Sequence, residues 1–204
     1  MISQKKHIKG TLAGLALILC LSQPVPALAG LPLETVKGHT NKVLDVLRDP
    51  SLKAESAKNA RKDKIRAISE KMFDFAELSK RTLANNWKRL SPEQQSEFIS
   101  LYTSLLEDAY AGKIMSYTDE KIVFNKEVAL SENTVEVQSI VLRKTAEIPI
   151  YYRMLMKNGI WKVYDVIIEG VSLINNYRTQ FREILSNNPP DSLLETLRKK
   201  IGKV

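Results

Sequence analysis

Residues 161–181 constrain the fold more than any other stretch, because a strand pattern there passes through a single glycine into a helix pattern. The first nine residues of the stretch place apolar side chains in both alternating sets, which is typical of a strand covered on both faces. Gly170 then frees the backbone, and Ser172 can cap a helix whose apolar stripe begins at Leu173. The last strand of a sheet is therefore expected to lead directly into a helix that lies across it.

The chain before this stretch carries the pattern of an antiparallel sheet. From Lys121 onward apolar residues recur with a period of two, and Asn158-Gly159 is a strong signal for a two-residue hairpin turn. The pattern predicts four strands joined by short turns into a meander. Their expected ranges are residues 121–129, 134–144, 147–157 and 160–169.

Helical patterns flank the sheet on both sides in sequence. The first helix is expected to end before Pro50, and the basic run over 51–71 predicts a solvated helix with one buried edge. Asp74 and Ser91 are expected to cap two further helices, and Asp191 to cap a last one. No repeat or linker divides the chain, so the order of helices, meander and helices predicts a single α+β domain.

The first 29 residues have the features of a cleaved secretory signal: basic residues, an apolar run and a small-residue cleavage site. The apolar run is about half the roughly 20 residues that a membrane-spanning helix needs. Cys20 follows a bulky leucine, so lipoprotein processing is not expected. The processed domain is therefore predicted to cover residues 30–204, to begin at Gly30 and, having no cysteine, to form no disulfide.

The charge of the processed chain is mildly basic. Removing the three lysines of the signal segment lowers the formal charge from +8 to +5. The charges are scattered and no basic strip is interleaved with aromatic residues, so nucleic acid is not an expected partner. Anionic lipid headgroups or an acidic protein surface suit this balance better.

The residues offer little for catalysis or metal binding, and neither an enzyme nor a cofactor is expected. Residues 30–204 contain one histidine, His39, and lack the spacings of nucleophile elbows, zinc sites, EF-hands and phosphate loops. The strongest enzyme alternative places Tyr152 across from Asp165, an acid–phenol pair of the kind that isomerases use. The simpler interpretation is that the hydroxyl satisfies a buried carboxylate, with Arg178 or helix-end amides as further partners.

The run WKVYDVIIEGVSLINNYRTQF resembles the C-terminal signature of the MlaC family of periplasmic phospholipid-binding proteins, also called the toluene-tolerance family. FDFAELSKRTLANNWKRLSPEQQSEFISLYTSLLEDAYAGKI is similar to the family's central helices, and IPIYYRMLMKNGIWKVYDV to its preceding hairpin. The resemblance covers roughly residues 32–200. It implies an α+β fold related to the nuclear-transport-factor-two-like and cystatin-like folds, with helices packed on the meander around an internal apolar cavity.

The same resemblance implies a function and partners. It implies a non-catalytic periplasmic carrier, expected to be a monomer, that holds phospholipid acyl chains and shuttles lipid between an inner-membrane ABC transporter complex and an outer-membrane lipoprotein–porin complex. Such a carrier would maintain outer-membrane lipid asymmetry. Two alternatives remain open: a carrier of another apolar ligand such as a hopanoid or quinone, and an envelope assembly module that binds peptides at a sheet edge. Headgroup recognition is expected to be weak, because no arginine cluster is evident.

The hairpin turn predicts which sheet face lines the cavity. With Asn158-Gly159 as the whole turn, Tyr152 is expected opposite Asp165, and paired residues share a face. This face is almost wholly apolar and holds Ile167, whereas the opposite face holds Val166 and two cations. The four pairs expected on the apolar face are Met156 with Trp161, Met154 with Val163, Tyr152 with Asp165, and Ile150 with Ile167.

The helix from Phe98 to Ala109 is expected to form the roof of the cavity. Replacing Ile167 by Trp is therefore predicted to exclude lipid, and the same change at Val166 to destabilise the fold. The residues predicted to contact lipid are Phe75, Leu78, Phe98, Tyr102, Leu105, Ile150, Tyr152, Met154, Val163, Ile167 and Val171.

Overall fold

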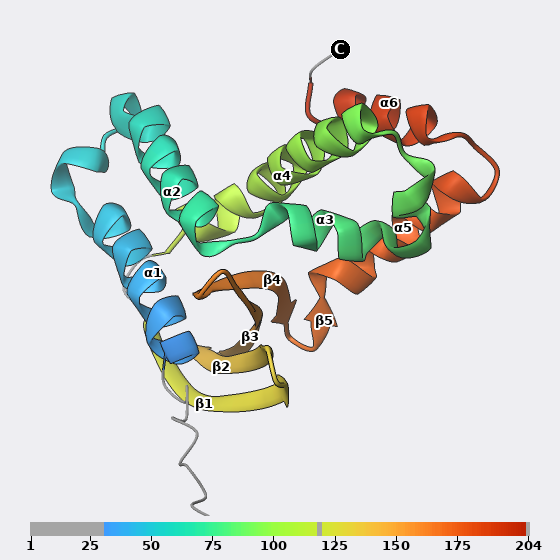
Figure 1. The fold of residues 1–204 in the computed structure, drawn as a ribbon. Coiled ribbons are helices and arrows are strands. Elements are labelled where there is room, and N and C mark those ends of the chain that lie inside the picture. The colour runs from blue at the N-terminus through green and yellow to red at the C-terminus, as the bar shows by residue number, and fades with distance from the viewer. Residues whose placement is uncertain (1–30, 118–119, 203–204) are drawn as a thin grey trace, which may run out of the picture.

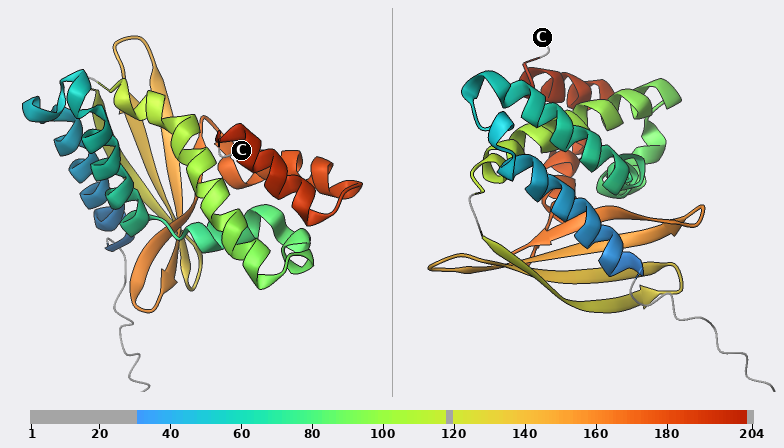
Figure 2. Two further views of the ribbon diagram at one scale, coloured as in Figure 1. Left: turned by 90° about the horizontal axis from the view of Figure 1, so that it is seen from above. Right: turned by 90° about the vertical axis from the view of Figure 1, so that its left-hand side faces the viewer.

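The computed structural model describes residues 31–117 and 120–202, and its α-helices pack around a strongly twisted sheet (Figures 1 and 2). The predicted signal segment and its cleavage site before Gly30 fall outside the described residues. The α-helices are α1 (Leu31–Arg48), α2 (Lys58–Met72), α3 (Phe75–Leu83), α4 (Pro92–Met115), α5 (Leu173–Ser186) and α6 (Pro190–Lys200). Short 3-10 turns occupy Pro50–Leu52, Glu55–Ala57 and Ala84–Arg89.

The sheet is an antiparallel meander in the order β1-β2-β3-β4-β5. Its strands are β1 (Lys121–Ser131), β2 (Thr134–Leu142), β3 (Glu147–Lys157), β4 (Ile160–Ile168) and β5 (Val171–Ser172). The predicted count of four strands is wrong, because Glu169 and Gly170 both adopt positive φ and form a second two-residue turn. That turn folds the chain back and pairs β5 with β4 before α5 begins.

Local sequence signals place most helix starts. Asp74 accepts a hydrogen bond from the Glu77 amide at 2.9 Å, and Ser91 and Gln94 form a capping box at the start of α4. The expected cap at Asp191 is wrong. There α6 begins at Pro190, whose fixed φ suits the first helical position, and the Asp191 carboxylate instead accepts a bond from Gln94 at 2.8 Å.

The predicted register of the last hairpin holds only for its first half. Met156 lies opposite Trp161 and Met154 opposite Val163, as expected, but a β-bulge follows between Arg153 and Met154. Beyond it Tyr152 pairs with Val166 rather than Asp165. Ile150 likewise pairs with Ile168 rather than Ile167. One extra residue in β4 therefore moves all later side chains of that strand to the other face.

The bulge places two β4 side chains where helices can bind them. The Tyr164 ring lies beneath the Arg81 guanidinium of α3, 4.1 Å from its centroid. The buried Asp165 carboxylate accepts hydrogen bonds from the Ser172 hydroxyl at 2.7 Å and the Ile174 amide at 3.1 Å. These contacts fasten β4 to α3 and α5, and both alternating sets of the strand are buried there, as its sequence predicts.

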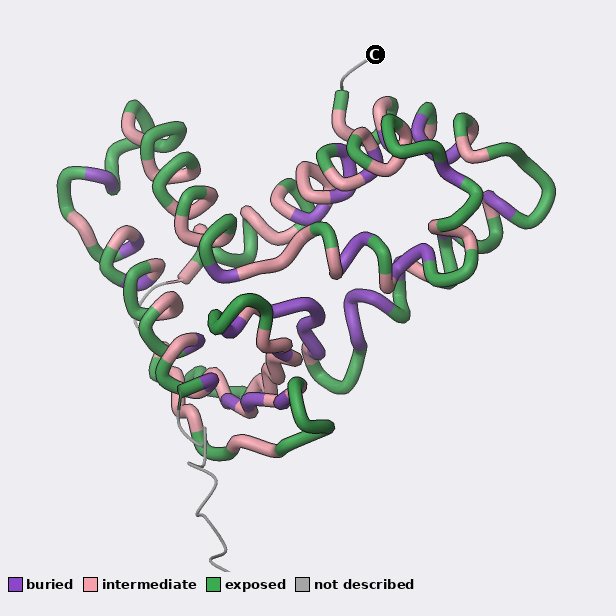
Figure 3. Tube along the Cα trace, viewed as in Figure 1, coloured by how far each residue is buried: buried purple, intermediate pink, exposed green. Residues whose placement is uncertain are grey.

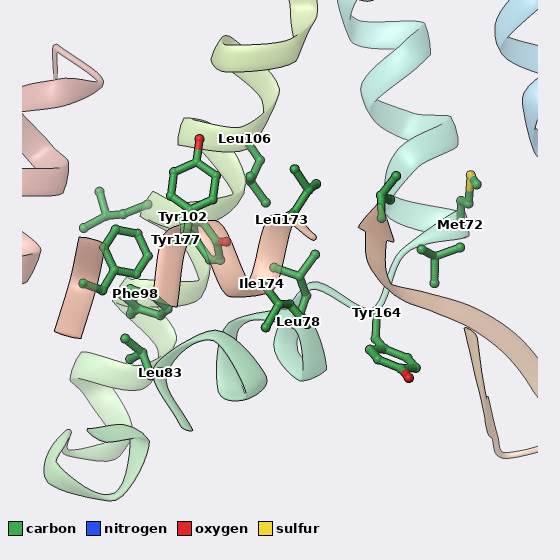
Figure 4. Packing of buried hydrophobic residues seen from close by; sticks show 14 of the residues in the cluster. Met72, Leu78, Leu83, Phe98, Tyr102, Leu106, Tyr164, Leu173, Ile174 and Tyr177 are labelled. Carbon is green, nitrogen blue, oxygen red and sulfur yellow. The ribbon is translucent and has the colours of Figure 1, made fainter. Parts of the chain in front are cut away.

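The densest core lies among α3, α4, α5 and α6, away from the α1–α2 hairpin. Figure 3 shows buried residues concentrated there and on β4, whereas α1 and α2 are mostly exposed or half-buried. At its centre Phe98 and Tyr102 of α4 pack against Tyr177 and Phe181 of α5, with ring centroids 5.2 to 5.6 Å apart (Figure 4). This cluster fixes the first half of α4, and the second half extends beyond it towards α2.

Candidate functional site: an apolar cavity between helices and sheet

A cavity of about 590 Å³ lies between the sheet, the α1–α2 hairpin and the C-terminal half of α4. This volume falls within the range of about 300–1,000 Å³ that is typical of ligand pockets. The side chains that line it are predominantly apolar, with charged groups from several elements among them. Such a space can shelter a large apolar ligand, whose polar end would then lie among the charged groups.

The floor of the cavity is one face of the sheet, formed by β3 and β4. Ile148, Ile150 and Tyr152 of β3 line it beside Val166 and Ile168 of β4. Because of the bulge, the even-numbered residues of β3 share this face with even-numbered residues of β4 beyond Asp165. The floor therefore consists of aliphatic and aromatic side chains without a charged residue among these five.

The walls are formed by α1, α2 and the C-terminal half of α4, whose apolar side chains face the cavity. On α4, the residues Phe98, Tyr102, Leu106, Tyr110 and Ile114 follow one another at four-residue spacing. Their burial falls along this series, from fully buried at Phe98 and Tyr102 to 37% exposed at Ile114, and the last three line the cavity. Further lining side chains come from the apolar stripes of α1 and α2, namely Val43, Leu44, Leu47 and Ile65.

Charged side chains also line the cavity, several of them in ion pairs. Arg66 of α2 binds Glu107 of α4, with 2.9 Å between Nε and Oε2. Its neighbour Lys62 binds Asp108, with 2.9 Å between Nζ and Oδ1. The hydrogen bond to Glu107 raises the pKa of Arg66. These two pairs join α2 to α4 at the boundary of the cavity.

Two further lining cations come from other elements. The Nε of Arg143, just after β2, lies 3.3 Å from Glu120. Lys113 lies over the Tyr110 ring, with Nζ 5.5 Å from its centroid. Cations from three separate parts of the chain therefore face the same cavity.

The structure places four of the eleven predicted lipid-contacting residues at the cavity: Phe75, Leu78, Ile150 and Tyr152. The other seven lie elsewhere. Ile167 is buried on the opposite face of β4 because of the bulge, and Val171 is exposed at the start of β5. The remaining five belong to the packed core or lie against it: Phe98, Tyr102, Leu105, Met154 and Val163.

Residues of the α1–α2 hairpin were missed as candidates for the cavity wall. The sequence predicts a buried edge for the second of these helices, but such an edge does not show which element it faces. Thr40 and Ser69 line the cavity between apolar neighbours, and no sequence signal separates them from ordinary helix residues. Val166 and Ile168 were missed because the bulge reverses the face of β4.

The acid–phenol pair of the enzyme alternative does not form. Tyr152 faces the cavity, and burial raises the pKa of its hydroxyl although hydrogen bonds with Ser139 and Thr40 oppose the shift. Asp165 instead bonds the start of α5 and lies 3.8 Å from Arg153. The prediction that the Tyr152 hydroxyl satisfies Asp165 is therefore wrong, and Arg178 instead donates to Asn175 and to the Arg81 carbonyl. Of the further partners expected for Asp165, a helix-end amide is present, that of Ile174.

The described residues offer neither a metal site nor a membrane-spanning helix. Over residues 31–117 and 120–202, no three His, Cys, Asp or Glu side chains gather in a way that could hold a metal ion. Within the same ranges, no helix has both the length and the apolar character needed to cross a membrane. The apolar cavity is therefore the feature of this part of the chain on which a function can be argued.

Comparison with known proteins identifies the family. The model of the MlaC protein family matches residues 37–199. The chain belongs to the MlaC family. The sequence resemblance is thereby confirmed, and the match covers the last two thirds of α1, all of α2 and the sheet, and nearly all of α6.

Two curated relatives agree with this assignment. The chain is 28% identical over 128 residues to the intermembrane phospholipid transport system binding protein MlaC of Haemophilus influenzae. That alignment spans 60% of each protein, so it leaves two fifths of the relative unmatched. The chain is also 24% identical over 180 residues to the toluene tolerance protein ttg2D of Pseudomonas putida, which spans 87% of this chain and 84% of that protein.

A solved structure shares the fold of this MlaC-family chain. It is the phospholipid-binding protein from Ralstonia solanacearum, determined in complex with a phospholipid. The TM-score is 0.74 at 24% sequence identity, and the match covers 84% of this chain and 97% of the other. The α+β fold class expected from sequence is thus confirmed, with five strands in place of four.

Proposed function

We propose that this protein is a phospholipid-binding carrier that holds acyl chains in the cavity beneath α1, α2 and α4. The observation that supports this most directly is an apolar cavity of about 590 Å³ in a member of the MlaC family. A curated relative named for intermembrane phospholipid transport and a structural neighbour determined with a bound phospholipid support the same ligand class.

The energetics of apolar burial suit a carrier. Sheltering roughly 30 methylenes from water is worth on the order of 20 kcal/mol, but a bilayer already gives the same chains equal shelter. The free energy of transfer between bilayer and cavity is therefore close to zero. A protein of this kind can load and unload lipid reversibly, and the direction of net transport is set by its partners.

The carrier is proposed to work in the periplasm between the two membranes of a Gram-negative envelope. Its partners would be an inner-membrane lipid ABC transporter complex and an outer-membrane lipoprotein–porin complex, and its role the maintenance of outer-membrane lipid asymmetry. The protein itself would catalyse no reaction. N-terminal sequencing of exported protein should find Gly30, and material that begins before residue 25 or carries an acylated Cys20 would contradict this location.

Mass spectrometry of a solvent extract tests the ligand class. Protein purified without detergent from its native membrane background should release diacyl phospholipid in a fixed ratio to protein. A polycyclic lipid or quinone in its place would point to a carrier of another apolar ligand. An extract without lipid would favour the envelope assembly module.

A further inference from the structure

Helix α2 presents an unusually basic surface beside the cavity. Among its residues six are basic and two acidic, and Met72 is its one buried residue. One face of the helix nevertheless lines the cavity, through Lys62, Ile65, Arg66 and Ser69. The apolar and cationic groups of this face thus lie together at the boundary of the cavity, where an amphipathic ligand changes from apolar to polar.

The Arg66 guanidinium is held in place by one hydrogen bond and keeps further N–H donors for a ligand. Its Nε–H donates to Glu107 at 2.9 Å, and the Glu107 side chain is 15% exposed, so the carboxylate anchors one edge of the group. The two terminal NH₂ groups donate no hydrogen bond to any described residue, and the contact of one with Asp63 is a loose 3.9 Å. An arginine held in this way keeps four N–H donors for an oxyanion.

Lys62 supplies a second cation one helical turn before Arg66. Residues four apart on a helix are neighbours on one face, with Cβ atoms about 5–6 Å apart. Lys62 is paired with Asp108, but both side chains are about half exposed, and exposed pairs of this kind are weak and readily exchanged. Its ammonium can therefore turn to a phosphate that is already bound to Arg66.

We infer that Arg66 and Lys62 form a subsite for the phosphate group of the bound lipid. The inference rests on the proposed function, because acyl chains in the cavity would place the headgroup at this boundary. The subsite binds the phosphate group that all phospholipids share, and the rest of the headgroup lies in solvent. Recognition beyond the phosphate is thus still expected to be weak, although the sequence alone did not show that two cations converge.

Arg143 offers a matched control. It also lines the cavity, and its Nε is also beside a mostly buried carboxylate, that of Glu120. It lies just after β2 and not in a helix, so it has no partner cation like that which Lys62 provides for Arg66 on α2. A general loss of positive charge should affect Arg143→Gln and Arg66→Gln equally, whereas a phosphate subsite on α2 affects Arg66→Gln alone.

The test compares two ligands with identical acyl chains, phosphatidylglycerol and diacylglycerol. Each is titrated into lipid-stripped full-length protein that carries a fluorescent fatty-acyl probe, and displacement of the probe is measured. The wild type should prefer phosphatidylglycerol by roughly tenfold, the scale of one or two charge-assisted hydrogen bonds. Arg66→Gln should abolish the preference, Arg66→Lys should keep part of it, and Arg143→Gln should retain it.

The outcomes separate this inference from the proposed function. Equal displacement by both ligands in the wild type would overturn the phosphate subsite and leave the acyl-chain carrier intact. Failure of both ligands to displace the probe would overturn the carrier itself. Loss of preference in Arg143→Gln but not in Arg66→Gln would overturn the assignment to α2. Finally, binding of inorganic phosphate to the lipid-stripped protein that depends on Arg66 would show a site for free phosphate, and would overturn the lipid assignment.

Discussion

Two neighbouring residues of β4 allow a sharp test of which sheet face holds the ligand. The bulge reverses the expectation from sequence, so Val166→Trp, and not Ile167→Trp, is now the variant expected to exclude lipid. Val166 and Ile167 are 6% and 7% exposed, but they point to opposite faces, and Val166 alone of the two lines the cavity. In Val166→Trp the indole can enter space that is about 590 Å³ in volume, so it should exclude lipid at a cost below about 1 kcal/mol. In Ile167→Trp no cavity receives the ring, so overpacking should cost about 1–3 kcal/mol.

These costs translate into measurable shifts. For a chain of 150–250 residues, each kcal/mol lowers Tm by about 2–4 °C, so Ile167→Trp should melt about 2–12 °C below the wild type. Lipid per protein is measured by mass spectrometry of solvent extracts, and Tm by circular dichroism on lipid-stripped samples. Val166→Trp should carry little lipid and melt close to the wild type, whereas Ile167→Trp should keep its lipid. If Val166→Trp keeps a full load and Ile167→Trp loses it without destabilisation, the assignment of the faces is wrong.

Three further predictions concern stability. Asp165→Ala leaves the Ser172 hydroxyl and the buried Ile174 amide without their acceptor, so it should lower the free energy of unfolding by about 2–3 kcal/mol. Urea titration measures this loss, and a loss within error would show that the carboxylate does not stabilise the contact between β4 and α5. Ser91→Ala removes the capping box of α4 and should cost about 1 kcal/mol with an unchanged m-value. Burial would raise the pKa of Asp74, but hydrogen bonds from Lys157 and a backbone amide lower it below 3.8 overall. Because the pKa of Asp74 is lower in the folded state than in the unfolded state, the ionised carboxylate stabilises the fold above about pH 4, and this stabilisation is lost as the pH falls through the folded-state pKa. Asp74→Asn should therefore flatten the decline of the unfolding free energy, measured by urea titration, below about pH 4.

The parts of the fold that sequence predicts well depend on neighbouring residues. The capping box at Ser91 needs only Gln94, three residues away, and the turn at Asn158-Gly159 needs only two residues that tolerate positive φ. Both are therefore evident from a short window of sequence. The strand boundaries follow for the same reason, since the alternation that defines each strand lies within it.

The bulge in β4 could not be predicted in this way, because its partners are distant in sequence. Tyr164 is covered by Arg81, and Asp165 is bound at the start of α5 by Ser172. An unbroken pairing would have aimed these two side chains differently, with Asp165 among the apolar residues of the cavity floor. The carboxylate at position 165 was the one warning in the sequence, since burying it on an apolar face costs several kcal/mol without a partner. In the structure the bulge places Asp165 on the opposite face of β4, where Ser172 and the Ile174 amide bind its carboxylate.

Helix α4 shows why a stripe of apolar residues does not by itself separate core from binding site. Phe98 and Tyr102 continue into Leu106, Tyr110 and Ile114 at constant spacing, yet the first pair is fully buried and Ile114 is 37% exposed. The difference arises from what lies opposite. The first half meets the aromatic rings of α5, whereas the second half meets the cavity and is joined to α2 by ion pairs. One helix therefore anchors the core at its start and walls the cavity at its end. Because the aromatic contacts with α5 hold the first half, substitutions near Ile114 are expected to alter ligand binding while that half keeps the domain folded.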